Sequence, residues 1–136
     1  MKKLADLKET LRPQSEYQLL INGEWREGAK GERIESYNPA TGEKLATIAV
    51  AEREDVNEAV ESAWAAFDEW SETSPQERAA LLLRIADRLE EEAERFATLE
   101  TLDNGKPIGE TMNIDVPASI DHLRYFAGVI RGESDE

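Results

Sequence analysis

Cysteine is absent from this 136-residue chain, and histidine occurs only once, as His122. Without cysteine the chain cannot form a disulfide framework, a cysteine-ligated metal site or an iron–sulfur cluster, and it has no thiol nucleophile. A single histidine excludes a histidine-based metal cluster and gives no basis for a Ser-His-Asp triad. We therefore predict no catalytic residue from these residue types.

Long apolar runs are also missing. No stretch approaches the roughly 20 apolar residues that a bilayer-spanning helix needs. The opening segment, MKKLADLKETLRP, lacks the apolar core of a secretory signal. We expect a soluble, cytoplasmic protein of about one domain with no membrane partner.

Positive charge is scarce relative to negative charge. The sequence has 30 acidic and 16 basic residues, a formal net charge of -14 and a calculated pI near 4.5. Binding to nucleic acid or to an anionic membrane depends on Lys and Arg displacing counterions, so we predict no nucleic acid partner. The acidic excess fits either solvated helix faces or a salt-tolerant source.

The first third of the chain has the pattern of short strands. Residues 1–16 are polar and charged with scattered leucines, and we expect them to form a flexible arm. From Tyr17 an apolar run is followed by Asn22-Gly23, the pair that favours a two-residue hairpin turn. Two further strands are predicted at 34–37 and 45–50, separated by a turn that contains proline and glycine.

The remaining two thirds have helical periodicity. Apolar residues recur at intervals of three and four between Asp55 and Trp70, which predicts a first helix. Ser74-Pro75-Gln76-Glu77 has the sequence of a capping box, and the second helix that it begins should stop near Gly105. Four glutamates between positions 90 and 94 fit either a break in this second helix or a solvated face. A last helix should run from about Ile108 to Phe126, and Pro117 should kink or restart it.

A search for further site motifs favours none. The glycines lack the spacing of a dinucleotide-binding or phosphate-binding loop, so no cofactor-binding residue is predicted. His122 alone is typical of an ordinary helix residue. Trp64, Phe67 and Trp70 have helical spacing, which is typical of core packing. From composition and periodicity alone the chain is an acidic α+β domain.

Six sequence words carry a resemblance to a known family. They cover the chain from Tyr17 to about Arg131, in one order and with similar separations: LINGEW, SYNPATGE, DVNEAV, AFDEW, ETLDNGKP and RYFAG. In this order they resemble the amino-terminal quarter of the NAD(P)-dependent aldehyde dehydrogenase superfamily. The later segment IDVPASIDHLRYFAG is most similar to the branches that oxidise acetaldehyde and betaine aldehyde.

The resemblance implies an α/β fold of the aldehyde dehydrogenase type that is incomplete in this chain. The portion present is expected to be an N-terminal β-hairpin and short strands followed by three or more long helices. Residues 17–131 would be the amino-terminal part of the cofactor domain, and 132–136 a truncated polar end. The complete enzyme oxidises an aldehyde to a carboxylic acid with NAD(P) and a cysteine nucleophile. This chain lacks those motifs, so we expect it to be inactive and to bind no cofactor when alone.

The resemblance also implies one metal site. Betaine aldehyde dehydrogenases hold K⁺ or Na⁺ with backbone oxygens before the NPATG turn and with the aspartate of the ETLD word, and the matching residues are Ser36, Tyr37 and Asp103. Such hard ions prefer carbonyl and carboxylate oxygens. The alternative is that Asp103 only caps the end of its helix.

A second implied site is the wall of the aldehyde tunnel, for which the matching helix residues are Ile114, Asp115, Ala118 and His122. Ordinary helix packing or exposure is the alternative for these residues.

The resemblance further implies a partner, either the remainder of an aldehyde dehydrogenase chain or a paralogue. Helix faces that include Leu82, Ile85 and Leu89 would then be exposed in the isolated chain and could drive self-association. A competing interpretation is a stand-alone, non-catalytic interaction module that binds another protein, such as a full-length paralogue.

Overall fold

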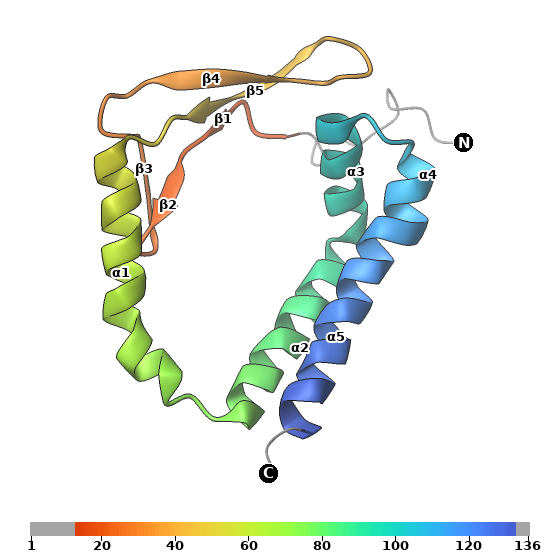
Figure 1. Cartoon of the computed structure of the whole chain (residues 1–136). Helices are drawn as coiled ribbons and strands as arrows, with labels where there is room; N and C mark the ends of the chain where they lie inside the picture. The colour runs from red at the N-terminus through yellow and green to blue at the C-terminus, as the bar shows by residue number, and fades with distance from the viewer. Residues whose placement is uncertain (1–12, 133–136) are drawn as a thin grey trace. The chain divides into compact units, whose positions relative to one another are not determined.

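The structure is a computed structural model that describes residues 13–132, and it divides into two compact units. We call residues 13–72 the strand unit and residues 73–132 the helical unit, and describe each by itself (Figure 1). The order of short strands followed by helices confirms the predicted mixture of secondary structure. Residues 1–12 of the predicted arm and 133–136 of the predicted polar end lie outside the described residues.

The strand unit contains two small sheets and one helix. A three-stranded sheet has the order β1-β5-β4, in which β1 is parallel and β4 antiparallel to β5. A separate antiparallel pair joins β2 and β3. The elements are β1 (Glu16–Tyr17), β2 (Leu19–Ile21), β3 (Glu24–Arg26), β4 (Arg33–Tyr37), β5 (Lys44–Ala49) and α1 (Arg53–Ser71).

The predicted hairpin at Asn22-Gly23 is confirmed. Strands β2 and β3 pair with Ile21 opposite Glu24, which leaves two residues in the turn. Asn22 has φ 52° and Gly23 has φ 79°. Positive φ at both positions is the geometry whose twist suits a two-residue hairpin, and Asn-Gly adopts it at little steric cost. The two later strands are confirmed as well, as β4 and β5.

Helix α1 confirms the predicted first helix, but its apolar face is not core. Trp64, Phe67 and Trp70 are exposed to 69%, 53% and 49%, and Trp64 and Phe67 contact each other edge to face. The prediction that these aromatic residues pack in a core is therefore wrong for this chain. The strand unit is too small to cover all of the stripe that helical periodicity places on one side of α1.

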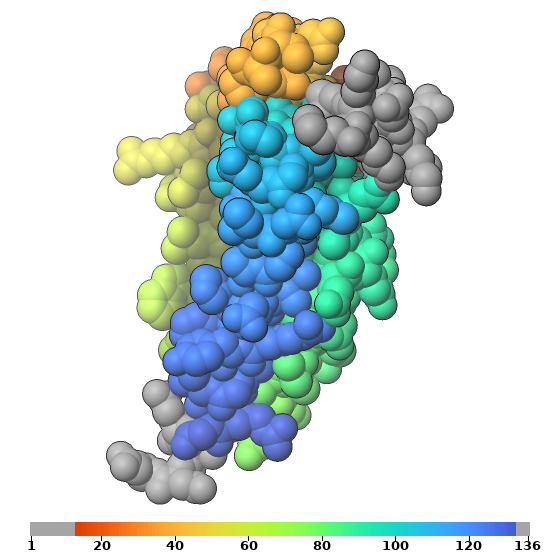
Figure 2. Space-filling view, turned by 90° about the vertical axis from the view of Figure 1, so that its right-hand side faces the viewer, coloured from red at the N-terminus to blue at the C-terminus, as the bar shows by residue number. Residues whose placement is uncertain are grey.

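The helical unit is built around the pairing of α2 and α5 (Figures 1 and 2). Small buried residues on the two helices, Ala86 of α2 and Ala127 of α5, allow them to approach closely, and Ala97 of α3 is buried beside them. Val116 and Ile120 complete the buried cluster. Leu89, predicted to be on an exposed face, instead packs against this cluster, whereas Ile85 is exposed. The elements are α2 (Pro75–Glu91), α3 (Ala93–Asn104), α4 (Ile108–Glu110), η3 (Thr111–Asp115) and α5 (Val116–Gly132).

The predicted helix boundaries are largely confirmed. The Ser74 hydroxyl accepts a hydrogen bond from the Glu77 backbone N–H, and the Glu77 carboxylate accepts one from the Ser74 N–H, which completes the capping box. Gly105 ends α3 with φ 81°. The glutamate run contains a true break, because Glu92 leaves helical geometry between α2 and α3. Within residues 13–132 no helix is both long and apolar enough to cross a membrane.

Candidate functional site

Ser36 and Tyr37, two of the predicted cation ligands, lie at the end of β4 where the pairing with β5 becomes irregular. The Tyr37 hydroxyl donates to the Glu35 carboxylate, which also accepts a 2.6 Å hydrogen bond from Lys44 Nζ. These contacts lower the pKa of Glu35, chiefly through Lys44, and raise the pKa of the Tyr37 hydroxyl. The Tyr37 side chain is thus engaged within its own sheet, and only the backbone oxygens of Ser36 and Tyr37 correspond to the predicted ligands.

Asp103, the third predicted ligand, is an exposed residue in the last turn of α3. The backbone of this helix end is satisfied by other groups, because the Gly105 N–H donates to the Thr101 carbonyl and the Lys106 N–H donates to Asn104 Oδ1. Asp103 belongs to the helical unit, whereas Ser36 and Tyr37 belong to the strand unit. The convergence of the three residues therefore stays a prediction, although two carbonyls and a carboxylate are a donor set that suits a hard monovalent ion.

Three of the four predicted tunnel residues share one exposed side of the last helical segment. Ile114, Ala118 and His122 are spaced by four residues and are all exposed. Asp115 is turned elsewhere, because its carboxylate accepts a 2.7 Å hydrogen bond from Lys106 Nζ. That contact raises the pKa of Lys106. The surface that these residues would offer to a substrate thus consists of Ile114, Ala118 and His122, and its role as a tunnel wall stays a prediction.

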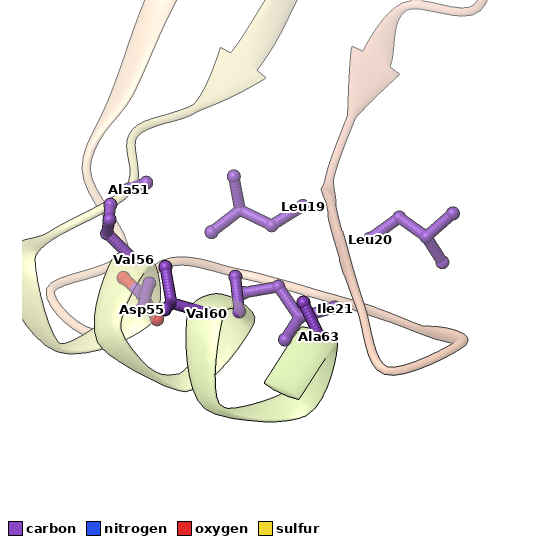
Figure 3. A pocket seen from close by; sticks show the side chains of 9 residues that line it. Leu19, Leu20, Ile21, Ala51, Asp55, Val56, Val60 and Ala63 are labelled. Carbon is purple, nitrogen blue, oxygen red and sulfur yellow. The ribbon is translucent and has the colours of Figure 1, made fainter. Parts of the chain in front are cut away.

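An apolar groove in the strand unit was not predicted from the sequence. It has a volume of about 380 Å³ and lies between β2 and the first half of α1 (Figure 3). Figure 3 shows Leu19 and Leu20 on opposite sides of β2, as strand alternation requires. The signal was present in the sequence as the apolar run LLI and the helical spacing of Val56 and Val60. The groove is lined by Leu19, Leu20, Ile21, Ala51, Asp55, Val56, Ala59, Val60 and Ala63.

Asp55, the one acidic residue of this groove, is a structural residue. It is 3% exposed, and its carboxylate accepts hydrogen bonds from the backbone N–H groups of Ala29 and Glu52, at 2.9 and 2.8 Å. Arg26 Nη2 donates to the other carboxylate oxygen at 3.2 Å. The two backbone donors and Arg26 lower the pKa of Asp55, so it is a weak base. The geometry suits a groove that packs against an apolar surface and does not suit proton transfer.

Known proteins resemble the chain over most of its length. A sequence model of the aldehyde dehydrogenase family matches residues 25–136. Aldehyde dehydrogenase B of Escherichia coli (strain K12) is 46% identical over 123 residues, which cover 90% of this chain and 24% of that protein. The EPTC-inducible aldehyde dehydrogenase of Rhodococcus erythropolis is 47% identical over 120 residues, which cover 88% of this chain and 24% of that protein.

Solved structures give the same picture. An indole-3-acetaldehyde dehydrogenase in its apo form matches with a TM-score of 0.89 and 36% identity, over 100% of this chain and 32% of that one. An aldehyde dehydrogenase from Bacillus cereus, solved as an NAD⁺ complex, matches with a TM-score of 0.79 and 42% identity, over 83% of this chain and 23% of that one. The chain spans about a quarter of the length of the curated relatives that it matches.

Proposed function

Because the chain belongs to the aldehyde dehydrogenase family, we propose that it forms the amino-terminal portion of an enzyme that oxidises an aldehyde to a carboxylic acid with NAD(P). The observation that carries the proposal is the unequal coverage, 90% of this chain against 24% of a relative that is 46% identical. The chain then supplies packing surfaces and a share of the substrate and cation sites, and other parts of the enzyme supply the catalytic groups.

The residue types of this chain support the proposal that other parts of the enzyme supply the catalytic groups. Aldehyde oxidation in the family requires a thiolate that attacks the carbonyl carbon and holds it while hydride leaves for the nicotinamide. This chain has no cysteine to do so. It also has no glycine turn of the kind that offers backbone N–H groups to a dinucleotide pyrophosphate. We therefore propose that the isolated 136-residue chain neither oxidises aldehydes nor binds NAD(P) usefully.

The exposed surfaces support a role in assembly with the remainder of such an enzyme. The stripe on α1, which includes Val56, Val60, Trp64, Phe67 and Trp70, is half or more exposed at nearly every position. Contiguous apolar surface of this kind marks an interaction site. The same stripe also favours the second candidate, a non-catalytic module that binds a paralogue, so the experiment must separate the two.

A chimera tests the proposal. Residues 17–131 would replace the matching segment of Aldehyde dehydrogenase B of Escherichia coli, and turnover would be followed by absorbance of the reduced nicotinamide with NAD and NADP in parallel. We expect aldehyde-dependent reduction of one or both cofactors by the chimera and none by the isolated chain. The matched control is the same chimera with Val60→Glu in the groove, which should fail to assemble. A folded chimera without activity, or turnover by the isolated chain, would contradict the proposal.

The interaction-module alternative has its own outcome. The isolated chain would be mixed with intact purified relative, and complex formation measured by sedimentation. Stable binding to the intact relative, together with an inactive chimera, would favour the module over the enzyme portion.

A further inference from the structure

The segment η3 contains a single π turn between α4 and α5. Its Val116 backbone N–H donates to the Thr111 carbonyl, five residues earlier, where an α-helix would use the residue four earlier. Pro117 follows at once. Proline has no backbone N–H to donate. In a regular α-helix its ring would also collide with the carbonyl four residues earlier, and a wider turn relieves that collision.

The π turn aligns two stripes of inward-facing residues, Ile108 and Thr111 before it and Val116 and Ile120 after it. Thr111 has no exposed surface, and Val116 and Ile120 are 6% and 7% exposed. In a regular α-helix, five residues would place Val116 about 140° around the axis from Thr111. One of the two stripes would then face solvent. The π turn sets Val116 above Thr111, so that Ile108 and Thr111 continue into Val116 and Ile120.

Polar side chains hold the turn. Thr111 Oγ1 lies 2.8 Å from Thr101 Oγ1 of α3, and both residues are buried. The Thr111 hydroxyl also donates to the Ile108 carbonyl at 3.2 Å. Asn113 Nδ2 donates to the Gly109 carbonyl at 2.7 Å. The side chains of Thr111 and Asn113 thus donate hydrogen bonds to backbone carbonyls of α4, the turn that precedes η3.

We propose that Thr111 is a positioning residue, which holds a one-residue π insertion and thereby presents Ile114, on the side it shares with Ala118 and His122, at the surface of the enzyme where the aldehyde enters. The statement about the aldehyde rests on the proposed function, whereas the statement about the insertion rests on the geometry alone. π turns are rare and occur often at functional sites, because the extra residue changes what a helix displays without changing what it buries. Ile114 is 61% exposed.

A pair of deletions tests the insertion in the full chain. Deleting Met112 leaves Thr111 and Val116 four residues apart, about 40° around an α-helix, so both stripes stay buried. We expect this variant to keep a cooperative thermal transition close to that of the original chain. Deleting Ser119 from the regular part of α5 is the matched control, since it turns the later core residues about 100° out of register. That variant should lose the transition, and equal damage by both deletions would overturn the proposal.

Two substitutions test Thr111 itself. Thr111→Val keeps the volume and removes the hydroxyl, and Thr111→Ser keeps the hydroxyl. We expect the Val116 amide to exchange with solvent about fivefold faster in Thr111→Val, as suits the loss of one hydrogen bond, and to return close to its original rate in Thr111→Ser. The Ala86 amide, at the centre of α2, is the control and should not change. Unaltered Val116 exchange in Thr111→Val would overturn the positioning role.

The chimera tests the link to the aldehyde. Deletion of Met112 should change KM for the aldehyde several-fold while KM for the nicotinamide cofactor stays constant, which a loss of stability alone would not do. Unchanged KM values for a series of aldehydes, in an active chimera, would overturn the presentation of Ile114 to the aldehyde. An inactive starting chimera would count against the proposed function, and the deletions and amide exchange would still decide the role of Thr111.

Discussion

The carboxylate of Asp55, buried in the first turn of α1, accepts a 2.9 Å hydrogen bond from the backbone N–H of Ala29, which follows β3 in the chain. The same Oδ2 atom accepts from the Glu52 N–H at 2.8 Å, so one oxygen both caps the helix and anchors the loop after the hairpin. Arg26 adds a contact from β3 itself. This residue therefore connects three segments of the strand unit.

Acid should weaken the strand unit through Asp55. Its pKa in the folded chain lies below the ordinary value of 3.8. Its contribution to stability is therefore complete above about the ordinary value and is lost as the pH falls through the lower, folded pKa. We expect Asp55→Asn to be less stable than the original chain in urea at pH 6 to 7, with a difference that shrinks toward pH 2. Glu58→Gln, which removes the charge of an exposed partner of Arg26, is the control and should show a smaller difference. Equal effects of the two substitutions would contradict the central role of Asp55.

A side chain at position 28 should not fit. A Cβ on Gly28 would lie 1.9 Å from the carbonyl oxygen of Val50 and 3.4 Å from Asp55 Oδ2. Because that overlap is with backbone, the loop must move, and we expect Gly28→Ala to cost about 1–3 kcal/mol of unfolding free energy. Gly109→Ala provides the comparison, since nothing lies within 4 Å of its Cβ and it is helical. Gly109→Ala should leave the free energy of unfolding in urea unchanged or raise it by up to about 1 kcal/mol. A smaller loss of stability for Gly28→Ala than for Gly109→Ala would contradict the prediction.

The stripe on α1 should drive self-association of the isolated chain. Sedimentation velocity over a range of concentrations should show oligomers, despite the net charge of -14. The double variant Trp64→Glu, Phe67→Glu should move the distribution toward monomer. Ala65→Glu adds a charge on the opposite side of the same helix and controls for charge alone. A compact monomer at high concentration for the original chain would contradict this prediction.

The cation proposal predicts a dependence on K⁺ or Na⁺. In an active chimera, replacing these ions with choline at constant ionic strength should lower the thermal midpoint, because a bound ion stabilises the folded state. Asp103→Asn should abolish that difference, whereas Asp121→Asn, on an exposed side of α5, should keep it. An identical midpoint with K⁺, Na⁺ and choline would remove the basis for the site at Ser36, Tyr37 and Asp103.

Local chemistry in the sequence determined much of this protein. Asn22-Gly23 specifies its turn because the two residues tolerate positive φ, and Ser74 with Glu77 specifies a helix start because their side chains satisfy free backbone N–H groups. Gly105 ends its helix for the same steric reason as Gly23 turns its hairpin. The family was likewise readable from its sequence words, and the match of the aldehyde dehydrogenase family over residues 25–136 confirms it.

Tertiary structure alone decided the features that depend on what a residue meets. Periodicity placed Trp64 and Phe67 on an apolar face, but burial requires a covering surface, and the strand unit does not supply one. The regular 3.6-residue period of an α-helix could not reveal the π turn, because it places Thr111 and Val116 on different sides. The two residues align only in the folded helical unit, where both pack inward. Asp55 reads as an ordinary helix-start residue, and only the folded loop brings Ala29 and Arg26 to its carboxylate.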